Sequence, residues 1–241
     1  MTYFNQESER EVEFNQKRSA LLSGISAVEV ANNPMLWMDR RTFTNILTKI
    51  DMFKMVKNVQ GSIVECGVYK GNGISTYSHL SSILEPVAFN RKVVGFDTFD
   101  GFPATSNADQ SSIPKGHLSD VNLDLLLQVF KVNDLNRNLG HIPKIELVKG
   151  DATKTIPEYV KNHPELIISL LYLDFDIYEP TRIALEYLLP LVPKGGIIGF
   201  DELNQNKWKG ETVAMKEVLK LSKIGLQKFV YDPHVSFFVV E

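Results

Sequence analysis

The fold is decided by a run that begins as a strand and ends as a helix: Ser62-Ile63-Val64-Glu65-Cys66-Gly67-Val68-Tyr69-Lys70-Gly71-Asn72-Gly73. Its first part is apolar and ends near an acid. Three glycines follow, and glycine lets a backbone turn tightly and approach a ligand closely. Apolar residues at helical spacing over 73–84 then predict a helix. The run therefore predicts a strand, a ligand-binding loop and a helix in succession.

Four more apolar runs also end on a carboxylate. The five predicted strands are 62–66, 92–97, 144–149, 167–174 and 196–201, separated by helix-like segments at 73–84, 120–133, 153–162, 179–191 and 210–223. Strands alternating with helices are parallel, so all five acids should lie along one edge of the sheet. Ligands bind outside that edge.

The chain closes with two apolar runs that no helix separates, Gln227–Tyr231 and Val235–Val240. The short turn Asp232-Pro233-His234 makes them antiparallel neighbours. The sequence thus predicts an α/β fold with a mostly parallel seven-stranded sheet and a terminal antiparallel hairpin. This is the Rossmann-like sheet of class I methyltransferases that use S-adenosylmethionine (SAM).

Residues before the alternating pattern look helical, with predicted helices over Glu7–Leu22 and Asp39–Val59. We therefore expect an N-terminal helical cap or interface segment over 1–60 and a SAM-dependent methyltransferase domain over 61–241. A long irregular stretch, 98–118, interrupts the domain beside the predicted ligand edge. It should be mobile without ligand and should close over the site.

Composition excludes several function classes. The 241 residues carry a net charge of −3 and no block of Lys or Arg, so nucleic acid is not an expected partner. No apolar run approaches the roughly 18 residues that a membrane span needs. The N-terminus is polar, unlike a signal peptide. A single cysteine, Cys66, fits a reducing compartment, so a cytoplasmic location is expected.

The glycine loop points to SAM. The spacing from Gly67 to Gly71 to Gly73 fits neither the dinucleotide fingerprint nor the phosphate loop of nucleotide hydrolases. In SAM enzymes an acid placed like Glu65 orients the ammonium of the methionine part, directly or through water. We therefore expect Glu65, Gly67, Tyr69, Gly71 and Gly73 to bind the cofactor. An ordinary tight turn between strand and helix is the alternative.

Two further acids complete the expected cofactor site. Asp97 ends the second strand, where an acid accepts hydrogen bonds from a ribose diol. Asp151 and Ala152 follow the third strand, where SAM enzymes commonly contact the adenine amino group. Asp151 is also well placed to cap a helix over 153–162, and both roles are compatible.

A second group of acids follows the fourth and fifth strands. Asp174, Asp201 and Glu202 should lie close together, and crowded carboxylates repel unless a cation neutralises them. Oxygen ligands suit Mg²⁺, which could hold a substrate hydroxyl and ease its deprotonation. The sequence therefore predicts these three residues as metal ligands and Asp174 as a catalytic residue.

Two residues outside the strands are candidates for contact with the acceptor. His117 lies in the irregular stretch and could act as a general base or touch substrate. Trp208 could flank the acceptor, although a surface aromatic is an equal alternative.

Five motifs in order resemble the macrocin O-methyltransferase (TylF/MycF-like) family. They occupy 64–71, 96–103, 150–157, 173–181 and 195–202, within a match over roughly residues 60–220. The most specific are Asp-Thr-Phe-Asp-Gly-Phe-Pro at 97–103 and Leu-Asp-Phe-Asp-Ile-Tyr-Glu at 173–179. The resemblance implies a SAM-dependent, Mg²⁺-assisted O-methyltransferase with a sugar hydroxyl as acceptor. Asp174, Asp201 and Glu202 fall on family metal positions, where Glu202 replaces the usual Asp.

Alternatives remain at this point. The acceptor could be a sugar nucleotide, a surface glycan or a glycosylated metabolite. The same carboxylates could serve a catechol or other small diol, in a pocket walled by aromatics. A catalytically silent SAM-fold subunit that binds a partner is a third possibility. The polar first helix suggests a homodimer or higher homo-oligomer that uses the N-terminal region.

Overall fold

The computed structural model describes residues 9–103, 105–109 and 115–241. Backbone contacts divide the chain into two units, Met1–Asn45 and Ile46–Glu241. The first residues of the predicted helix Glu7–Leu22, and residues 104 and 110–114 of the irregular stretch, lie outside the described residues.

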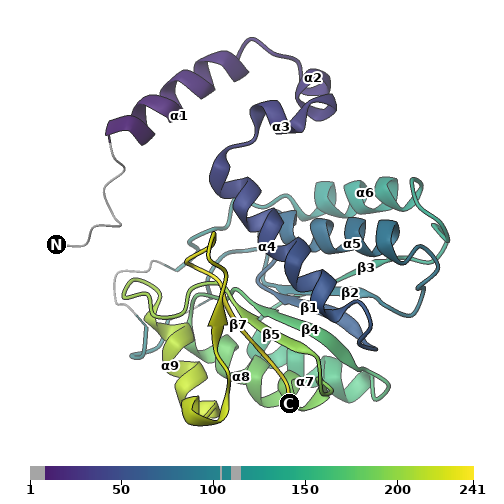
Figure 1. The fold of residues 1–241 in the computed structure, drawn as a ribbon, viewed down its shortest axis with the longest axis vertical. Coiled ribbons are helices and arrows are strands. Elements are labelled where there is room, and N and C mark those ends of the chain that lie inside the picture. Colours follow the sequence, from purple (N-terminus) through teal and green to yellow (C-terminus); the bar gives the residue numbers. More distant parts are fainter. Residues whose placement is uncertain (1–8, 104, 110–114) are drawn as a thin grey trace. The chain divides into compact units, whose positions relative to one another are not determined.

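The larger unit is built on a seven-stranded sheet in the order β3-β2-β1-β4-β5-β7-β6 (Figure 1). The strands are β1 (Ser62–Cys66), β2 (Val93–Asp97), β3 (Ile145–Lys149), β4 (Ile168–Leu173), β5 (Ile197–Phe200), β6 (Gln227–Lys228) and β7 (Ser236–Val239). The first five are mutually parallel, and β7 pairs antiparallel with both β5 and β6. The predicted fold class is confirmed.

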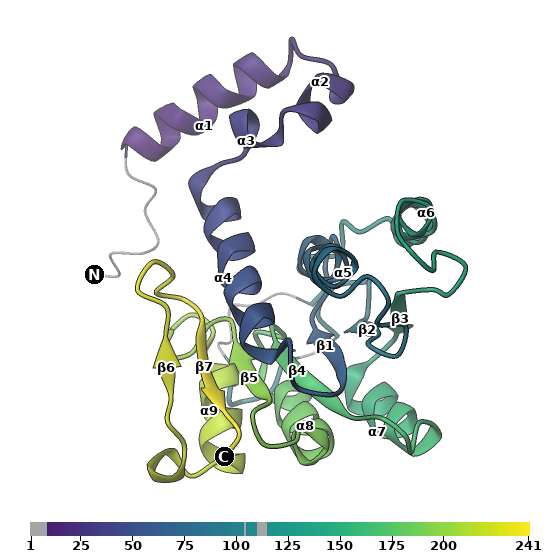
Figure 2. The same cartoon turned by 45° about the vertical axis from the view of Figure 1, so that its right-hand side comes forward.

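Helices cover both faces of this sheet (Figures 1 and 2). They are α4 (Arg40–Val56), α5 (Asn72–Leu84), α6 (Leu123–Asp134), α7 (Ala152–Asn162), α8 (Tyr178–Leu188) and α9 (Lys209–Val218), with short 3₁₀ turns at Leu189–Leu191 and Leu221–Lys223. From Ile46 onward, α4 lies with α5 and α6 on one face, and α7, α8 and α9 lie on the other.

The alternation of side chains along β1 creates two cores. Val64 and Cys66 point into the core beneath α7 and α8, whereas Ile63 points into the core that holds Met52 and Phe53 of α4. Neighbouring residues of a strand face opposite sides, so a strand covered on both faces must be apolar throughout. This explains why the strand runs are apolar without a polar alternation.

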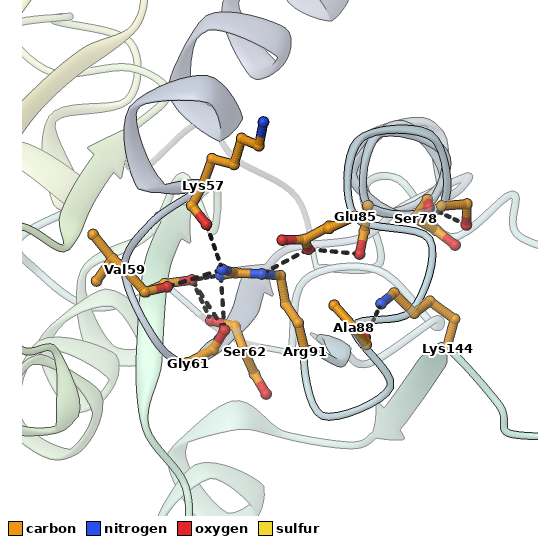
Figure 3. Close-up of polar contacts among 12 residues, drawn as sticks. Lys57, Val59, Gly61, Ser62, Ser78, Glu85, Ala88, Arg91 and Lys144 are labelled. Carbon is orange, nitrogen blue, oxygen red and sulfur yellow. Dashed lines mark hydrogen bonds and ion pairs between the residues drawn. The ribbon is translucent and has the colours of Figure 1, made fainter. Parts of the chain in front are cut away.

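Arg91 ties together the sheet edge opposite the carboxyl ends (Figure 3). Its guanidinium donates to the carbonyl oxygens of Gly61, Val59 and Lys57 at 2.9, 2.9 and 3.1 Å. It also donates to the Ser169 hydroxyl at 2.6 Å and pairs with Glu85 at 2.7 Å. The planar fork of arginine suits such a buried node, because it offers five donors in fixed directions.

The N-terminal unit contains α1 (Glu9–Leu22), α2 (Ala27–Asn32), α3 (Pro34–Trp37) and the start of α4. The short helices α2 and α3 lie between the two helices that the sequence predicts at Glu7–Leu22 and Asp39–Val59. Asp39 caps α4 by accepting from the Thr42 amide at 2.9 Å. Within α1, α2 and α3 no described residue is buried.

Some element ends differ from the sequence expectation. The predicted helix 210–223 ends at Val218, and the chain is extended at Leu219 before a separate 3₁₀ turn. The predicted strand Gln227–Tyr231 is reduced to β6, because only Gln227 and Lys228 pair with β7. None of the helices among the described residues is long and apolar enough to span a membrane.

Candidate active site

The glycine loop after β1 turns tightly against the backbone of Asp174. Gly67 has φ of 96°, and a Cβ there would lie 2.0 Å from the carbonyl oxygen of Asp174. Tyr69 and Gly71 also adopt positive φ, at 47° and 81°. A non-glycine residue with positive φ is uncommon and occurs mainly in turns or strained sites. Positive φ at Gly67, Tyr69 and Gly71 fits a loop that a ligand approaches closely and also fits an ordinary tight turn, so the cofactor role of the loop stays a prediction.

Asp97 holds this loop in place. One carboxylate oxygen accepts from the amides of Val68 and Tyr69, both at 2.8 Å, and the other accepts from the Phe99 amide at 2.7 Å. A carboxylate offers about four acceptor positions, so three backbone donors leave room for a further one. The expected contact with a ribose stays a prediction, and the loop-holding role was not expected from the sequence.

Asp151 caps α7, which is one of the two compatible roles that the sequence predicted for it. Its Oδ1 accepts from the Thr153 amide at 3.0 Å and from the Thr153 hydroxyl at 2.7 Å. Ala152 begins the helix and is buried. Contact of this pair with adenine stays a prediction.

Glu65 is buried at the end of β1, beneath the first turn of α5. A Cβ on Gly73 would lie 1.9 Å from Glu65 Oε1, so glycine is required for the helix to approach so closely. Burial raises the pKa of Glu65 to about 7, and the ammonium of Lys49 opposes that rise. The Lys49 Nζ atom lies 3.8 Å from Glu65 Oε1, and both side chains are almost fully buried.

Lys49 was not found from the sequence, where it looked like one charge on an amphipathic helix. In the structure it enters the site from α4, with its ammonium 4.0 Å from the centre of the Tyr172 ring. The Tyr172 hydroxyl in turn donates to Asp201 Oδ1 at 2.5 Å. Lys49 therefore lies between the expected cofactor acid and the second group of acids.

The second group of acids contains five carboxylates, two more than the three predicted ligands. Asp174, Asp176, Asp201 and Glu202 are partly buried after β4 and β5, and Glu211 of α9 is fully buried. The Glu202 amide donates to Glu211 Oε1 at 3.4 Å. Asp176 adopts a positive φ of 63°. No sequence signal marked Glu211, because an acid in a first helical turn is normally solvated.

Burial, with the nearby Asp201, raises the pKa of several acids in this group. Burial, then the nearby Asp201, raises the pKa of Asp174 well above its usual range, and burial with Asp201 also raises the pKa of Glu202 to about 7. Burial and Asp201 likewise raise the pKa of Glu211. Such like-charge crowding is relieved by a proton or a cation.

A ready-made metal site is not present within 9–103, 105–109 and 115–241: no three Asp, Glu, His or Cys side chains there are arranged to hold an ion. The predicted ligand set Asp174, Asp201 and Glu202 therefore stays a prediction. The donor chemistry fits Mg²⁺, which commonly uses one or two carboxylates and completes its shell with water and substrate oxygens.

Both acceptor candidates lie in one aromatic cluster. The rings of His117 and Trp208 are stacked with centres 6.4 Å apart, and Phe102 lies 5.9 Å from His117 and 6.0 Å from Trp208. The Lys207 ammonium lies 4.7 Å from the centre of the Trp208 ring. The cluster joins the segment after β2 to the segment after β5, and both segments leave the carboxyl ends of strands.

The irregular stretch is anchored at described positions. Asp109 is buried and accepts from the amides of Ser106 and Tyr178 at 2.7 and 2.8 Å. The Phe102 amide donates to the His117 carbonyl oxygen at 3.1 Å. These bonds join the stretch to the start of α8 and close it on itself, so any opening must break them. Its expected mobility stays a prediction.

Comparisons with known sequences and structures identify the family of this chain. A model of the macrocin-O-methyltransferase (TylF) family matches residues 34–225. The chain belongs to this family. No curated protein sequence matches the chain significantly.

Solved structures agree with the family. A structure of CalS11, described as a calicheamicin methyltransferase, is 33% identical over 98% of this chain and 95% of its own, with a TM-score of 0.92. An apo structure of CalS11, described as a TDP-rhamnose 3′-O-methyltransferase, shows 33% identity over 98% and 97%, with a TM-score of 0.85. The O-methyltransferase NovP, at 19% identity, 82% and 79% coverage and a TM-score of 0.64, shares the fold.

Membership of the macrocin O-methyltransferase family makes this chain a SAM-dependent O-methyltransferase. The resemblance to this family that the sequence motifs indicated is confirmed. The alternative of a catalytically silent subunit is set aside.

Proposed function

We propose that this enzyme transfers the methyl group of SAM to a hydroxyl of a sugar, either nucleotide-linked or part of a glycan or glycosylated metabolite. The observation that carries the proposal is the match to CalS11, which is described as a TDP-rhamnose 3′-O-methyltransferase and aligns over nearly the whole chain. The acidic edge of the sheet supports it, because crowded carboxylates suit a hydroxyl-bearing acceptor better than a phosphate placed among them.

The cofactor site in this proposal is the loop after β1 with its flanking acids. Glu65 binds the ammonium of SAM, Asp97 binds its ribose, and Asp151 with Ala152 binds its adenine. Gly67, Tyr69, Gly71 and Gly73 let the backbone pass close to the ligand. The support is the positive φ of the loop residues and the position of all three acids at the same edge of the sheet.

Catalysis in this proposal is mostly positioning. SAM supplies an electrophilic methyl carbon on a sulfonium. Asp174 accepts the proton of the acceptor hydroxyl while the oxygen bonds to the methyl carbon and the carbon–sulfur bond breaks, leaving S-adenosylhomocysteine. The position of Asp174 supports this role, because its amide donates to the carbonyl oxygen of Cys66 at 2.8 Å and its backbone lies against Gly67, beside the glycine loop. His117, whose ring centre lies 5.9 Å from that of Phe102, is the alternative general base or a residue that contacts the acceptor.

We include Mg²⁺ in the proposal as an assisting ion. Asp174 and Asp201, with Glu202, would hold it, and it would lower the pKa of a bound hydroxyl. The support is the mutual repulsion of these acids, which a divalent cation would relieve.

A cytoplasmic location and a homodimer or higher homo-oligomer that uses the N-terminal helices are further parts of the proposal. Exposed apolar side chains on those helices, including Phe14, Leu21 and Leu36, support the oligomer.

A catechol or other small diol is a second candidate acceptor, favoured by the ring cluster of Phe102, His117 and Trp208. One assay separates the two. Purified enzyme with methyl-labelled SAM and Mg²⁺ is offered nucleotide-linked deoxysugars, glycosylated metabolites and catechols, with Asp174→Asn as the inactive control. We expect label on a sugar. Label transferred only to catechols would refute the sugar proposal.

A further inference from the structure

The buried ion pair of Lys49 and Glu65 is unusual for its position. Lys49 comes from α4, ahead of the alternating strands and helices, yet its side chain is only 2% exposed at the glycine loop. Removing an ammonium and a carboxylate from water costs several kcal/mol for each ion, and their attraction seldom returns more. The pair therefore contributes little to stability by itself, and its position at the glycine loop points to a role in ligand binding.

The two oxygens of Glu65 are not equivalent. Oε1 lies 3.8 Å from the Lys49 ammonium. Oε2 is buried and has no hydrogen-bond partner of normal geometry among the described residues, although the Ile74 amide interacts with the carboxyl and lowers its pKa. Buried polar atoms without a partner are rare in native structures, and each calls for an explanation such as a missing ligand. This oxygen belongs to a side chain that the first turn of α5 covers closely, at Gly73.

The surroundings of Lys49 keep its ammonium in one place. The Tyr172 ring lies 4.0 Å from Nζ and the Tyr77 ring 6.0 Å, and both rings are fully buried. A cation over aromatic faces is attracted by the ring electrons, and more so when water is excluded. The ammonium is thus held from one side by rings and from the other by Oε1.

We propose that Lys49 is a positioning residue for the cofactor, holding Oε1 of Glu65 so that Oε2 is left for the α-ammonium of SAM, directly or through one water. The inference rests on the proposed role of Glu65 in cofactor binding. It assigns part of the cofactor site to α4, outside the motifs that identify the family.

The test compares two ligands that differ in the group Glu65 would bind. S-adenosylhomocysteine carries the amino-acid part, and 5′-methylthioadenosine lacks it. Calorimetry measures both with wild-type protein, Lys49→Met and Lys49→Gln. Lys54→Met is the matched control, because Lys54 lies on the same helix with a side chain 61% exposed. The Lys49→Gln variant keeps a polar group in case Lys49→Met does not fold.

We expect the Lys49 variants to bind S-adenosylhomocysteine about tenfold to a hundredfold more weakly, the range for a lost contact with a charged group. Their affinity for 5′-methylthioadenosine should stay within about twofold of wild type. Lys54→Met should change neither affinity. Lys49→Arg, which keeps the charge, should recover part of the loss.

Two results would overturn the inference while leaving the proposed function intact. Equal weakening of both ligands would show that Lys49 only supports the fold of the loop, and unchanged affinity for both would show that it has no part in cofactor binding. If wild-type protein bound neither ligand, the proposed cofactor site itself would be wrong, and the inference with it.

Discussion

Replacing Asp97 by alanine removes the carboxylate that accepts from the amides of Val68, Tyr69 and Phe99. A hydrogen bond to a charged group contributes about 1.5–3 kcal/mol when buried. Asp97 is only partly buried, so water replaces much of what is lost. We therefore expect about 2–3 kcal/mol of destabilisation for the three bonds together, rather than their full sum.

The loss should weaken ligand binding as well as the stability of the fold. Urea denaturation gives the change in unfolding free energy, and calorimetry with S-adenosylhomocysteine gives the change in affinity, which we expect to weaken by about 1.5–3 kcal/mol. Asp97→Asn is the matched variant, because its amide oxygen can still accept from one side. The losses in unfolding free energy and in affinity should be about half as large for Asp97→Asn as for Asp97→Ala. An alanine variant within about 0.5 kcal/mol of wild type in both measurements would refute the loop-holding role.

Three further predictions concern the acids and the N-terminal helices. Asp174→Asn should abolish methyl transfer yet leave cofactor affinity within a few-fold, and full activity of chelator-treated wild-type enzyme would contradict the metal proposal. In the absence of divalent cations, the unfolding free energy of the wild type should fall between about pH 5 and 8 relative to that of Glu202→Gln. The pKa of Glu202 is raised to about 7 in the folded state, so protonation of Glu202 favours folding at low pH. That contribution disappears as the carboxyl ionises. Thermal unfolding measured across this range checks the sign, and parallel curves would contradict it. Deleting residues 1–22 should impair turnover while leaving the unfolding of 61–241 almost unchanged, because α1 has no buried residue; equal loss of both would count against a cap or interface role.

The sheet could be predicted because its signals are local. Each of the five parallel strands lies in a mostly apolar run, and a helix-like segment comes before the next run, so their order and direction follow without knowledge of distant contacts. Errors occurred where a distant partner decides the outcome. Phe229 to Tyr231 look like a strand, yet only Gln227 and Lys228 find a partner in β7.

The candidate site divides in the same way. The acids at strand ends could be predicted, since parallel strands place their carboxyl ends together. Lys49 and Glu211 could not, because a charged residue on a helix normally faces water and nothing local marks one that is buried. The hydrogen bonds of Asp97 to the loop also depend on a turn whose φ values no periodicity reveals.

The node at Arg91 has a consequence for how this enzyme can change. The bonds of its guanidinium to Lys57, Val59, Gly61 and Ser169 join the loop between α4 and β1 to β4, at the edge of the sheet away from the acids. Contacts that keep the strands in register there do not involve the segments after β2 and β5. Substitutions of exposed residues in those segments can therefore accumulate without unfolding the chain, whereas Asp109 and Leu203, which are buried, should be kept. Acceptor preference in this enzyme should be open to redesign by exchanging exposed residues within 98–118 and 203–208, while Arg91 should tolerate almost no replacement.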